Sequence, residues 1–598
     1  MKNTPRDAFE PVGGGAGATR RNALKFAAGA AVGVLFTPAP WRLITDTALW
    51  SENWPGVPRP IRGEPRVKYT HCTLCPAGCG VRARCVGEQP VSLAGAGGGL
   101  CAFGVAAHHL PYHPRRVRQG KAKEAAAAVA DAIARCAPSE RVAVIDLRPG
   151  RTASWTYRRA LAALPNGTYL APAQPPYAVN LASARTVLSL GAPLLDGWCS
   201  PANAFAARER FHLIQAEPVE TRTAALADEW LPIRPGSEEA LARALAGTLP
   251  LPEAAEKTGL AQRQISELGR ELKDNGPALA IAGGMPKWAV ALNLAFGAWG
   301  TTLLPRAEAP VPAAWNKAAA ARDLAGVPDR SIRVLMIDES VPGEPFEWDA
   351  IRGKLAEHPV VVAFSSFPEG YARYADFVLP AALYPETADD VATPADSPAP
   401  VFRVAAPLVP PAPGAVNPVE FVAAAAGFAA GDPLRERADA IHASGRGTLF
   451  TYADGRAQAV KDVKPDDFWK ALNEGGEWAG DAAAKAPRPD AAAASGEPAV
   501  PESPLPLRLV VAETALAASP LASKLYRESG LRLAAGRVAL HPSEARACDV
   551  EDGTRAWLVT EGGRREVEVT VDEGVRPGVV VVSAPPGFRA GHGKVVRA

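Results

Sequence analysis

Short apolar runs alternate with helical stretches through the middle of the chain. These runs are 141–147, 186–192, 211–217, 278–284, 333–339 and 359–366. Continuous apolar strands separated by helices imply parallel sheets that are covered on both faces. We therefore expect an α/β fold, with doubly wound parallel-sheet domains over residues 119–475.

A different pattern begins after residue 506. Apolar or alternating runs are separated by the turn sequences EDG (551–553) and EGG (561–563). This pattern predicts strands joined by tight turns, so we expect residues 507–598 to form a small β-barrel domain. The preceding residues, 476–506, are rich in proline and alanine. They carry too little apolar surface to fold alone, which predicts a solvated linker.

The N-terminal region has a third pattern, in which Arg20 and Arg21 precede an apolar run from Phe26 to Phe36. This order is typical of a twin-arginine (Tat) export signal, which we expect at residues 1–45. The apolar run is too short to cross a hydrocarbon layer of about 30 Å as a helix. Proteins that use this route are exported folded and usually carry cofactors, so a periplasmic cofactor protein is expected. No clear Ala-x-Ala cleavage site follows, and an uncleaved segment would hold the chain at a membrane surface. The alternative is a chance arginine pair before a core helix.

The composition excludes some classes of function. The chain has 598 residues, a net charge of +2 and no long basic run, so nucleic-acid binding is not expected. Eight cysteines in a chain of this length are too few for a disulfide scaffold. Cys136, Cys199 and Cys548 stand alone in the sequence, and we expect them to be small buried apolar side chains.

Four other cysteines form the strongest chemical pattern in the chain. Cys72, Cys75 and Cys79 are spaced C-x2-C-x3-C, and Cys101 follows them. Three thiolates from a tight loop and a fourth from a distant turn suit a [4Fe–4S] cluster. Soft sulfur ligands favour iron–sulfur clusters or zinc over hard cations. The pattern therefore predicts a metal centre, with an iron–sulfur cluster as the first hypothesis.

Several alternatives stay open at these cysteines. A c-type haem would need a histidine after the second cysteine, where Pro76 stands. Structural zinc is uncommon with this spacing, and disulfides are the ordinary periplasmic alternative. Gly78 and Gly80 would let the backbone approach a cluster closely. Cys85 is expected to be a bystander on a strand, and His71 is expected to face solvent.

Candidate binding residues follow from the expected sheets. Gly191, Asp196 and Trp198 come at or just after the end of one apolar run, and Glu217 ends the next. They would lie at the carboxyl ends of parallel strands, where ligands bind in such sheets. The acidic side chains there would accept hydrogen bonds from a guanine or a ribose. The alternative assigns Gly191 to a turn and Glu217 to a helix cap.

Five segments in the same order resemble the molybdopterin oxidoreductase superfamily, which contains formate dehydrogenases and periplasmic nitrate reductases. They are CTLCPAGCG with LCAFG (72–104), then 184–198, 211–241, 372–387 and 539–580. The resemblance implies a [4Fe–4S] domain at residues 65–118, α/β domains, and a C-terminal barrel that binds a pterin dinucleotide. Segments 35–60 and 519–532 are similar to the molybdopterin-like subunits of menaquinone reductase complexes, to which alternative complex III is related.

The resemblance adds two candidate residues near a pterin. Segment 232–241 is similar to a family turn, with Glu238 where the family has Asp. Ser237 beside it is also a natural helix N-cap. Glu386 falls in a further matching stretch, but the residues that follow it in the family are missing here. This departure weakens the case for a complete pterin site.

Two departures concern the metal of the family. Its protein ligand lies in a loop that corresponds to residues 146–157, which contain no cysteine. Ser154 and Asp146 are the candidate ligands, although Ser154 is also explained as a helix cap. Phe103 stands where catalytic members carry a basic residue between cluster and pterin. These departures favour a subunit that has lost its metal chemistry.

We therefore expect a periplasmic electron-transfer and structural subunit of a membrane-bound, quinone-linked respiratory oxidoreductase complex. The resemblance implies a multihaem cytochrome c, a ferredoxin-like iron–sulfur protein and a polytopic quinone-binding membrane subunit as partners. One alternative is an active molybdenum or tungsten oxidoreductase with two molybdopterin guanine dinucleotides and Ser154 as the metal ligand. A second is an exported scaffold with neither metal nor cluster.

Overall fold

The chain divides into two compact units, Met1–Glu64 and Pro65–Ala598. Cys199 and most of segment 519–532 lie outside the residues described by this computed structural model. The described residues are 20–36, 63–164, 166–198, 201–343, 346–481, 487–489, 503–511, 520–521, 524, 536–582 and 591–598.

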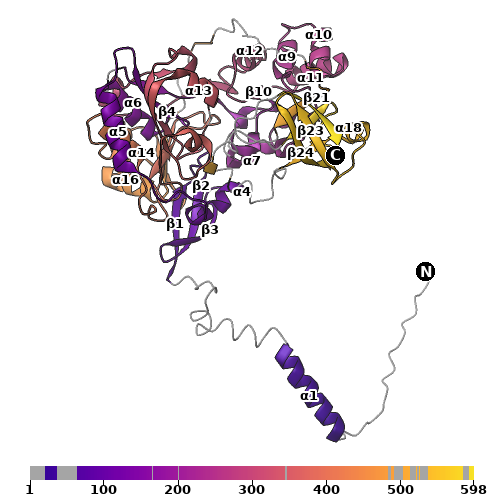
Figure 1. The fold of residues 1–598 in the computed structure, drawn as a ribbon, viewed down its shortest axis with the longest axis horizontal. Helices are drawn as coiled ribbons and strands as arrows, with labels where there is room; N and C mark the ends of the chain where they lie inside the picture. Colours follow the sequence, from indigo (N-terminus) through magenta and orange to yellow (C-terminus); the bar gives the residue numbers. More distant parts are fainter. Residues whose placement is uncertain are drawn as a thin grey trace, which may run out of the picture. The chain divides into compact units, whose positions relative to one another are not determined.

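The first unit contains helix α1 (Arg20–Phe36), which holds both arginines and the apolar run (Figure 1). Its large apolar side chains Leu24 and Phe26 are exposed. Among the helices that the structure describes, none combines the length and apolar character needed to traverse a bilayer. Much of the predicted signal, residues 1–19 and 37–45, lies outside the described residues.

The second unit begins with a small antiparallel sheet in the order β1-β2-β3. Its strands are β1 (Pro65–His71), β2 (Gly80–Val86) and β3 (Gln89–Gly95), and they are followed by the short helix α4 (Ala102–Ala106) (Figure 1). Along β2, Val81, Ala83 and Cys85 are buried while Arg82 and Arg84 are exposed. The period-two pattern of the sequence therefore forms one apolar face, as strands on a core require.

The central layer is a six-stranded parallel sheet in the order β12-β5-β4-β13-β14-β15. Val142 and Val144 face a core shared with three helices, whereas Ala143 and Ile145 face a second core. Both faces are covered, which explains the continuous apolar runs. The strands are β4 (Arg141–Asp146), β5 (Thr168–Leu170), β12 (Ala321–Arg322), β13 (Ile332–Asp338), β14 (Leu355–Phe364) and β15 (Phe377–Leu379). The covering helices are α5 (Ala122–Ala134), α6 (Thr152–Ala162) and α14 (Pro418–Ala425) on one face and α13 (Trp348–Lys354) on the other.

A second parallel sheet has four strands in the order β10-β7-β8-β9. Its strands are β7 (Thr186–Leu190), β8 (His212–Ala216), β9 (Glu229–Leu231) and β10 (Ala278–Ala282). Its helices are α7 (Pro201–Arg208), α8 (Arg222–Ala225), α9 (Glu238–Leu245), α10 (Leu251–Thr258), α11 (Gln262–Asp274) and α12 (Lys287–Ala295). Strands β6 (Tyr177–Val179) and β11 (Leu303–Pro305) pair antiparallel beside it. These two parallel sheets confirm the predicted α/β class.

An antiparallel sheet in the order β16-β17-β20-β18-β19 was not predicted. Strand β20 (Glu477–Ala479) falls inside the segment 476–506 that we predicted as a linker, because the buried Trp478 gives this strand a side chain to pack. Residues 482–486 and 490–502 of that segment lie outside the described residues. The other strands are β16 (Asp389–Val391), β17 (Val401–Ala405), β18 (Thr448–Thr451) and β19 (Arg456–Ala459), packed with helices α15 (Pro433–Ala443) and α16 (Pro465–Asn473).

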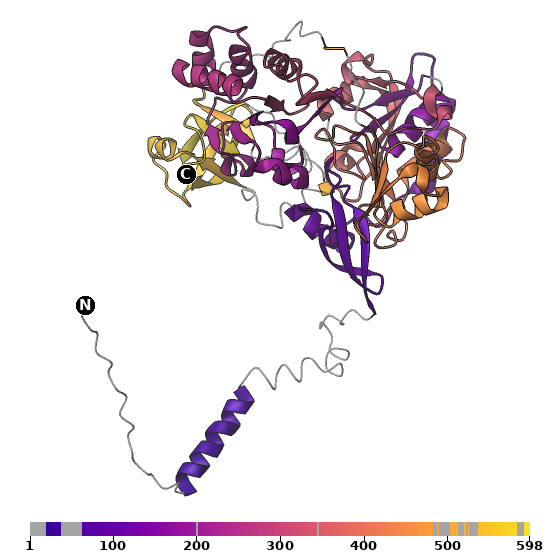
Figure 2. The same ribbon diagram turned by 180° about the vertical axis from the view of Figure 1, so that it is seen from behind.

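The C-terminal residues form a closed barrel in the order β21-β25-β22-β24-β23-β26, which confirms the predicted barrel. Figure 2 shows this barrel in yellow, seen from behind. Alternating valines and leucines of the strands fill its interior. The elements are β21 (Leu507–Val511), β22 (Arg537–Leu540), α18 (Pro542–Ala547), β23 (Arg555–Thr560), β24 (Gly563–Val571), β25 (Val579–Val582) and β26 (His592–Arg597).

Candidate functional site

The four predicted ligand cysteines lie around one loop at the end of the first sheet. Cys72 directly follows β1, and its N–H donates to the carbonyl of Cys79 over 2.9 Å, which closes the loop between β1 and β2. Cys75 lies inside that loop. Cys101 occupies the N-cap position of α4. The three loop cysteines are buried and Cys101 is half-buried.

The structure brings the four thiols together. Burial raises the pKa of Cys72 well above its ordinary value, and the nearby Cys75, Cys101 and Cys79 raise it further. Burial followed by the neighbouring thiols likewise raises the pKa of Cys79 to about 12. Each of the seven cysteines that the structure describes is a free thiol, Cys72, Cys75, Cys79 and Cys101 among them. The donor set is therefore four converging sulfurs in a dry environment.

The four sulfurs are not gathered as closely as the ligands of a preformed single-ion site. Tetrahedral zinc with Zn–S bonds of about 2.3 Å places its sulfurs about 3.8 Å apart. Within the described residues, three or more ligand atoms lie within 4.8 Å of one another only at His212, Glu229 and Glu271, which contain no cysteine.

Two buried donors without partners lie against this site. The hydroxyl of Tyr384 is buried and lacks a hydrogen-bond partner among the described residues. Cys72 and Cys79 lie close enough to raise the pKa of this phenol further, although burial is the larger cause. The second donor is Arg148, whose Nε and Nη2 are also buried without a partner. Buried donors without acceptors are rare, so these two donors suit a bound group that is rich in acceptors.

Arg148 was missed by the sequence analysis. It follows β4, and its Nη1 donates to the carbonyl of Thr73, inside the cysteine loop. Burial lowers the pKa of this guanidinium to about 10, and the nearby Cys75 opposes that shift. Arg148 therefore stays charged at neutral pH beside the cysteines. Phe103, which was expected to replace a basic residue, is buried in the apolar cluster that contains Cys72. The positive charge near the cysteines therefore comes from Arg148, on the loop after β4, and not from the position of Phe103.

His71 does not face solvent, so that prediction was wrong. It is fully buried, because the end of β1 packs against β17: the ring Nδ1 lies 3.2 Å from the carbonyl of Val404. Burial, aided by Arg403, lowers the pKa of His71 to about 4, so the ring is neutral. Arg403 is itself paired with Glu477 over 2.9 Å and donates to the carbonyl of Ala77 in the cysteine loop. Cys85 lies buried on β2, as predicted.

The loop that would carry a metal ligand is instead filled by a buried ionic network. Ser154 donates to Asp146 over 2.5 Å, and both side chains are buried. Arg151 lies at the centre of this network and pairs with Asp146, Asp338 and Asp389 at 3.3, 3.0 and 2.7 Å. Ser154 lies inside α6, whose N-cap is Arg151, so its predicted role as a helix cap was wrong.

Two tyrosine hydroxyls donate to the carboxylates of the same network. Tyr157 donates to Asp338 over 2.9 Å, and Tyr169 donates to Asp146 over 2.7 Å. Burial raises the pKa of Asp389 to about 6, and the neighbouring Asp390 adds to the shift, while Arg151 opposes it. The two candidate metal ligands, Ser154 and Asp146, are thus engaged by protein donors and acceptors. This loop does not fit a role as the ligand of a molybdenum or tungsten ion.

The predicted binding residues divide into groups. Gly191 adopts a left-handed φ of +66° and donates its N–H to the carbonyl of Ala216 over 3.0 Å, so it lies beside the end of β8 and makes a turn. Glu217 is buried at that end and accepts a hydrogen bond from Thr221. Of the two alternative structural roles, the turn at Gly191 is therefore observed. Trp198 is half-buried against the core behind β7.

Two further predicted residues lie elsewhere or outside the description. The side chain of Asp196 lies outside the described residues. Glu238 begins α9, away from β7 and β8 in the sequence, and its charge acts on Arg508 of the barrel. Ser237 holds the N-cap position of α9, but its hydroxyl donates to the carbonyl of Arg234 over 2.6 Å instead of capping the helix.

Comparisons with known proteins agree with this architecture. A family model described as the molydopterin dinucleotide binding domain matches residues 521–595. The menaquinone reductase, molybdopterin-binding-like subunit, of Nitratidesulfovibrio vulgaris is 27% identical over 677 aligned residues, which cover 96% of this chain and 94% of that protein. The structure of acetylene hydratase from Pelobacter acetylenicus matches with a TM-score of 0.63 at 15% identity, covering 87% of this chain and 94% of the other. The chain has the molybdopterin-oxidoreductase fold.

The predicted resemblance is thereby confirmed, including its narrower part. In this molybdopterin-oxidoreductase fold, the matched domain comprises the barrel strands from β22 onward. Glu386, in another matching stretch, is buried and forms a two-pronged pair with Arg116, one branch of which measures 2.5 Å. Glu386 therefore has a structural role, which its position in a family motif did not reveal.

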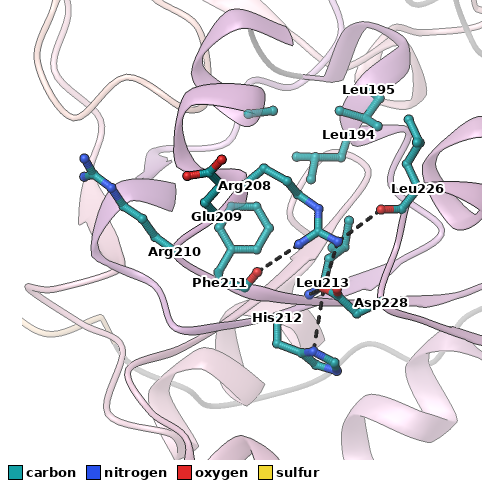
Figure 3. A pocket seen from close by; sticks show the side chains of 11 residues that line it. Leu194, Leu195, Arg208, Glu209, Arg210, Phe211, His212, Leu213, Leu226 and Asp228 are labelled. Atoms are coloured by element: carbon teal, nitrogen blue, oxygen red, sulfur yellow. Dashed lines mark hydrogen bonds and ion pairs between the residues drawn. The ribbon is translucent and has the colours of Figure 1, made fainter. Parts of the chain in front are cut away.

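A surface pocket of about 640 Å³ lies on the opposite edge of the smaller parallel sheet (Figure 3). His212 starts β8 and Asp228 precedes β9, so both line the amino ends of the strands. Arg208 pairs with Asp228 over 2.8 Å across the pocket. Neither Gly191 nor Glu217 lines this pocket, although Leu194 and Leu195, which begin the helical turn that contains Asp196 and Trp198, do.

Proposed function

We propose that this chain is a periplasmic electron-transfer and structural subunit of a membrane-bound, quinone-linked respiratory oxidoreductase complex. It would hold a [4Fe–4S] cluster on Cys72, Cys75, Cys79 and Cys101 and perform no molybdenum chemistry. The observation that carries the proposal is the convergence of four cysteine thiols, three of them buried and one half-buried, around one loop. Such a cluster supplies single-electron transfer at a potential set by its surroundings.

The surrounding residues support this function. The loop between β1 and β2 supplies three of the sulfurs, and Tyr384 and Arg148 place buried donors without partners among the described residues near them. The raised pKa values of the thiols mean that metal binding must displace protons, as is usual for buried cysteine sites. Burial of the loop also excludes water, which protects a cluster from hydrolysis and oxidation.

The ionic network supports a loss of metal catalysis. Freeing Ser154 or Asp146 to bind a metal would leave Arg151 and the Tyr169 hydroxyl with fewer partners in a dry interior. Breaking a buried ion pair typically costs about 3 to 5 kcal/mol. The network is therefore better suited to hold α6 on the sheet than to donate a ligand.

Partners and location are proposed from the relative and from the N-terminal sequence. The similar protein is named as a subunit of a menaquinone reductase, which supports a multisubunit quinone-linked complex for this chain as well. We propose a multihaem cytochrome c, a ferredoxin-like iron–sulfur protein and a polytopic quinone-binding protein as the other subunits. The Arg20–Arg21 pair supports export through the Tat route.

Metal analysis of the purified full chain tests this proposal. We expect about four iron atoms per chain, a cluster EPR signal after reduction, and no stoichiometric molybdenum or tungsten. A serine variant of Cys75 should lose iron, whereas Cys85→Ser, a matched buried cysteine on β2, should keep it. A colourless, iron-free chain would contradict the cluster, and a stoichiometric molybdenum or tungsten atom would contradict the loss of catalysis.

The second candidate function is that of an active molybdenum or tungsten oxidoreductase. The match of residues 521–595 to the molydopterin dinucleotide binding domain favours it, because such a domain would support a bound molybdopterin guanine dinucleotide. The same metal analysis separates the two functions. A chain that binds a pterin but no metal would support the first function, that of an electron-transfer and structural subunit.

A further inference from the structure

Arg148 differs from the other buried arginines around the cysteines in how its positive charge is balanced. Its Nη1 bonds to the carbonyl of Thr73, while Nε and Nη2 have no partner among the described residues. The ionisable groups that act on its charge are Cys75, Arg151, Asp389 and Cys72. Asp389 is already paired with Arg151 over 2.7 Å. Within the part of the chain that the structure describes, Arg148 is therefore a buried cation with no ion pair to a carboxylate.

Arg403, the other guanidinium close to the cysteines, is electrostatically different. It approaches Cys79 and donates to the carbonyls of Ala77 and Gly78 in the loop. Its charge is offset by Glu477, which accepts from its Nε over 2.9 Å. A paired cation contributes little net field at a distance, so the unbalanced positive charge at the site comes from Arg148.

We propose that Arg148 is a positioning residue that raises the reduction potential of the cluster held by Cys72, Cys75, Cys79 and Cys101. This inference rests on the proposed function. Each reduction adds one electron and one negative charge to the thiolate-bound group. A buried positive charge stabilises the more negative state, and free N–H donors toward sulfur act in the same direction. Tyr384, whose hydroxyl has no partner, would add a smaller effect of the same sign because it is neutral.

The experiment is an EPR-monitored redox titration of the full chain and of variants at position 148. In Arg148→Met and Arg148→Gln, which remove the charge, we expect the equilibrium constant for reduction to fall at least tenfold. A tenfold change corresponds to about 59 mV for a one-electron couple. In Arg148→Lys, which keeps the charge, we expect a change of less than threefold. Arg82→Met, which removes an exposed arginine from β2 of the same sheet, should leave the potential unchanged.

Each outcome decides between the proposals. A wild-type chain without iron would refute the proposed function before position 148 is tested. An iron-loaded Arg148→Gln protein with the wild-type potential, or a Lys variant that falls as far as Gln, would overturn the inference and leave the cluster in place. If Arg148→Met loses iron, the inference is tested by comparing the reduction potentials of Arg148→Gln and Arg148→Lys. Loss of iron from all three variants would make Arg148 a residue that builds the site, and would likewise overturn the inference.

Discussion

At the scale of single residues, buried charges in this protein are mostly matched in pairs or small networks. Arg116 with Glu386 and Arg437 with Asp390 are examples, with all four side chains almost inaccessible to solvent. Removing one partner from such a pair is costly because the other charge stays buried and unpaired. Arg148 differs from these residues, since it has no carboxylate partner.

The Arg116–Glu386 pair gives a direct test of this principle. We expect Glu386→Ala to lower the free energy of unfolding by about 3 to 5 kcal/mol, because it leaves the Arg116 guanidinium buried and unpaired. The double variant Arg116→Met with Glu386→Leu should recover most of that loss. Chemical denaturation followed by circular dichroism measures both. Glu88→Ala, which breaks the exposed pair with Lys68, is the control and should change little. Equal effects of the Glu386 and Glu88 variants would refute the argument.

Asp389 gives the protein a predictable dependence on pH. Its pKa is raised by burial from 3.8 to about 6 in the folded state. Between these values the unfolded chain ionises first, so stability from this group is lost as pH rises from about 4 to about 6. Asp389→Asn cannot ionise, so its free energy of unfolding relative to wild type should rise by about 3 kcal/mol over that interval.

Denaturation at a series of pH values between 4 and 7 measures this difference. The control is Asp329→Asn, because an exposed pair with Lys354 lowers the pKa of that carboxyl. The control should show no gain with rising pH. A relative stability of Asp389→Asn that falls with rising pH would show that Arg151 outweighs burial at this carboxyl.

At the scale of elements, the cysteine loop depends on backbone shape. Gly78 adopts φ +59° between Cys75 and Cys79, and a Cβ on it would lie 2.8 Å from Val391 of β16. An alanine there is strained by its own backbone and also collides with a strand. The loop therefore has both its shape and its distance from β16 fixed by this glycine.

Gly78→Ala should accordingly reduce the cluster content of the purified protein to less than half of the wild-type value, because the loop cannot close on β16. Iron analysis and the visible absorbance of the cluster measure this loss. Gly99→Ala is the matched control, since its Cβ would meet nothing within 4 Å and its φ is not left-handed. Retention of full iron by Gly78→Ala would mean that the loop adapts and that this contact does not define the site.

The elements also show what the sequence could predict and why the rest was missed. Apolar runs such as 141–147 are buried on both faces, and that property is readable from composition alone. Strands β16 and β20 have three residues each, and the latter pairs with β17, more than seventy residues earlier in the chain. No local pattern records such a pairing. His71 was placed on the surface because its polarity was visible in the sequence and the strand that covers it was not.

The site residues, too, could be predicted only where a local sequence pattern marks them. The four cysteines share a distinctive spacing, so they could be selected as candidate ligands from the sequence alone. Arg148 and Tyr384 reach the site from loops that are distant in the chain, and although both lie in segments that resemble the family, nothing in those segments marks either residue as a neighbour of the cysteines. Likewise, Ser154 fits a helix cap by sequence, whereas the structure joins its hydroxyl to Asp146, eight residues earlier. Contacts made by the fold itself are invisible until the fold is known.

At the scale of the whole molecule, the site belongs to more than its N-terminal sheet. The cysteine loop contacts β17 through Arg403, the loop after β4 through Arg148, and Tyr384 from the segment before β16. A cluster inserted here would therefore be enclosed only once the α/β domains have folded. That order suits an export route that carries folded proteins, and it makes the N-terminal arginines a test of the proposed location.

We expect the double variant Arg20→Lys with Arg21→Lys to remain in the cytoplasm with its iron bound. The arginine pair is a receptor-read address, and lysine keeps the charge but not the planar guanidinium. Cell fractionation with immunodetection, followed by iron analysis of each fraction, measures the result. The matched control is Arg82→Lys with Arg84→Lys, an exposed arginine pair on β2 that should leave export unchanged. Normal export of the Arg20–Arg21 variant would exclude the twin-arginine route, whereas export of iron-free protein by the wild type would show that loading does not precede translocation.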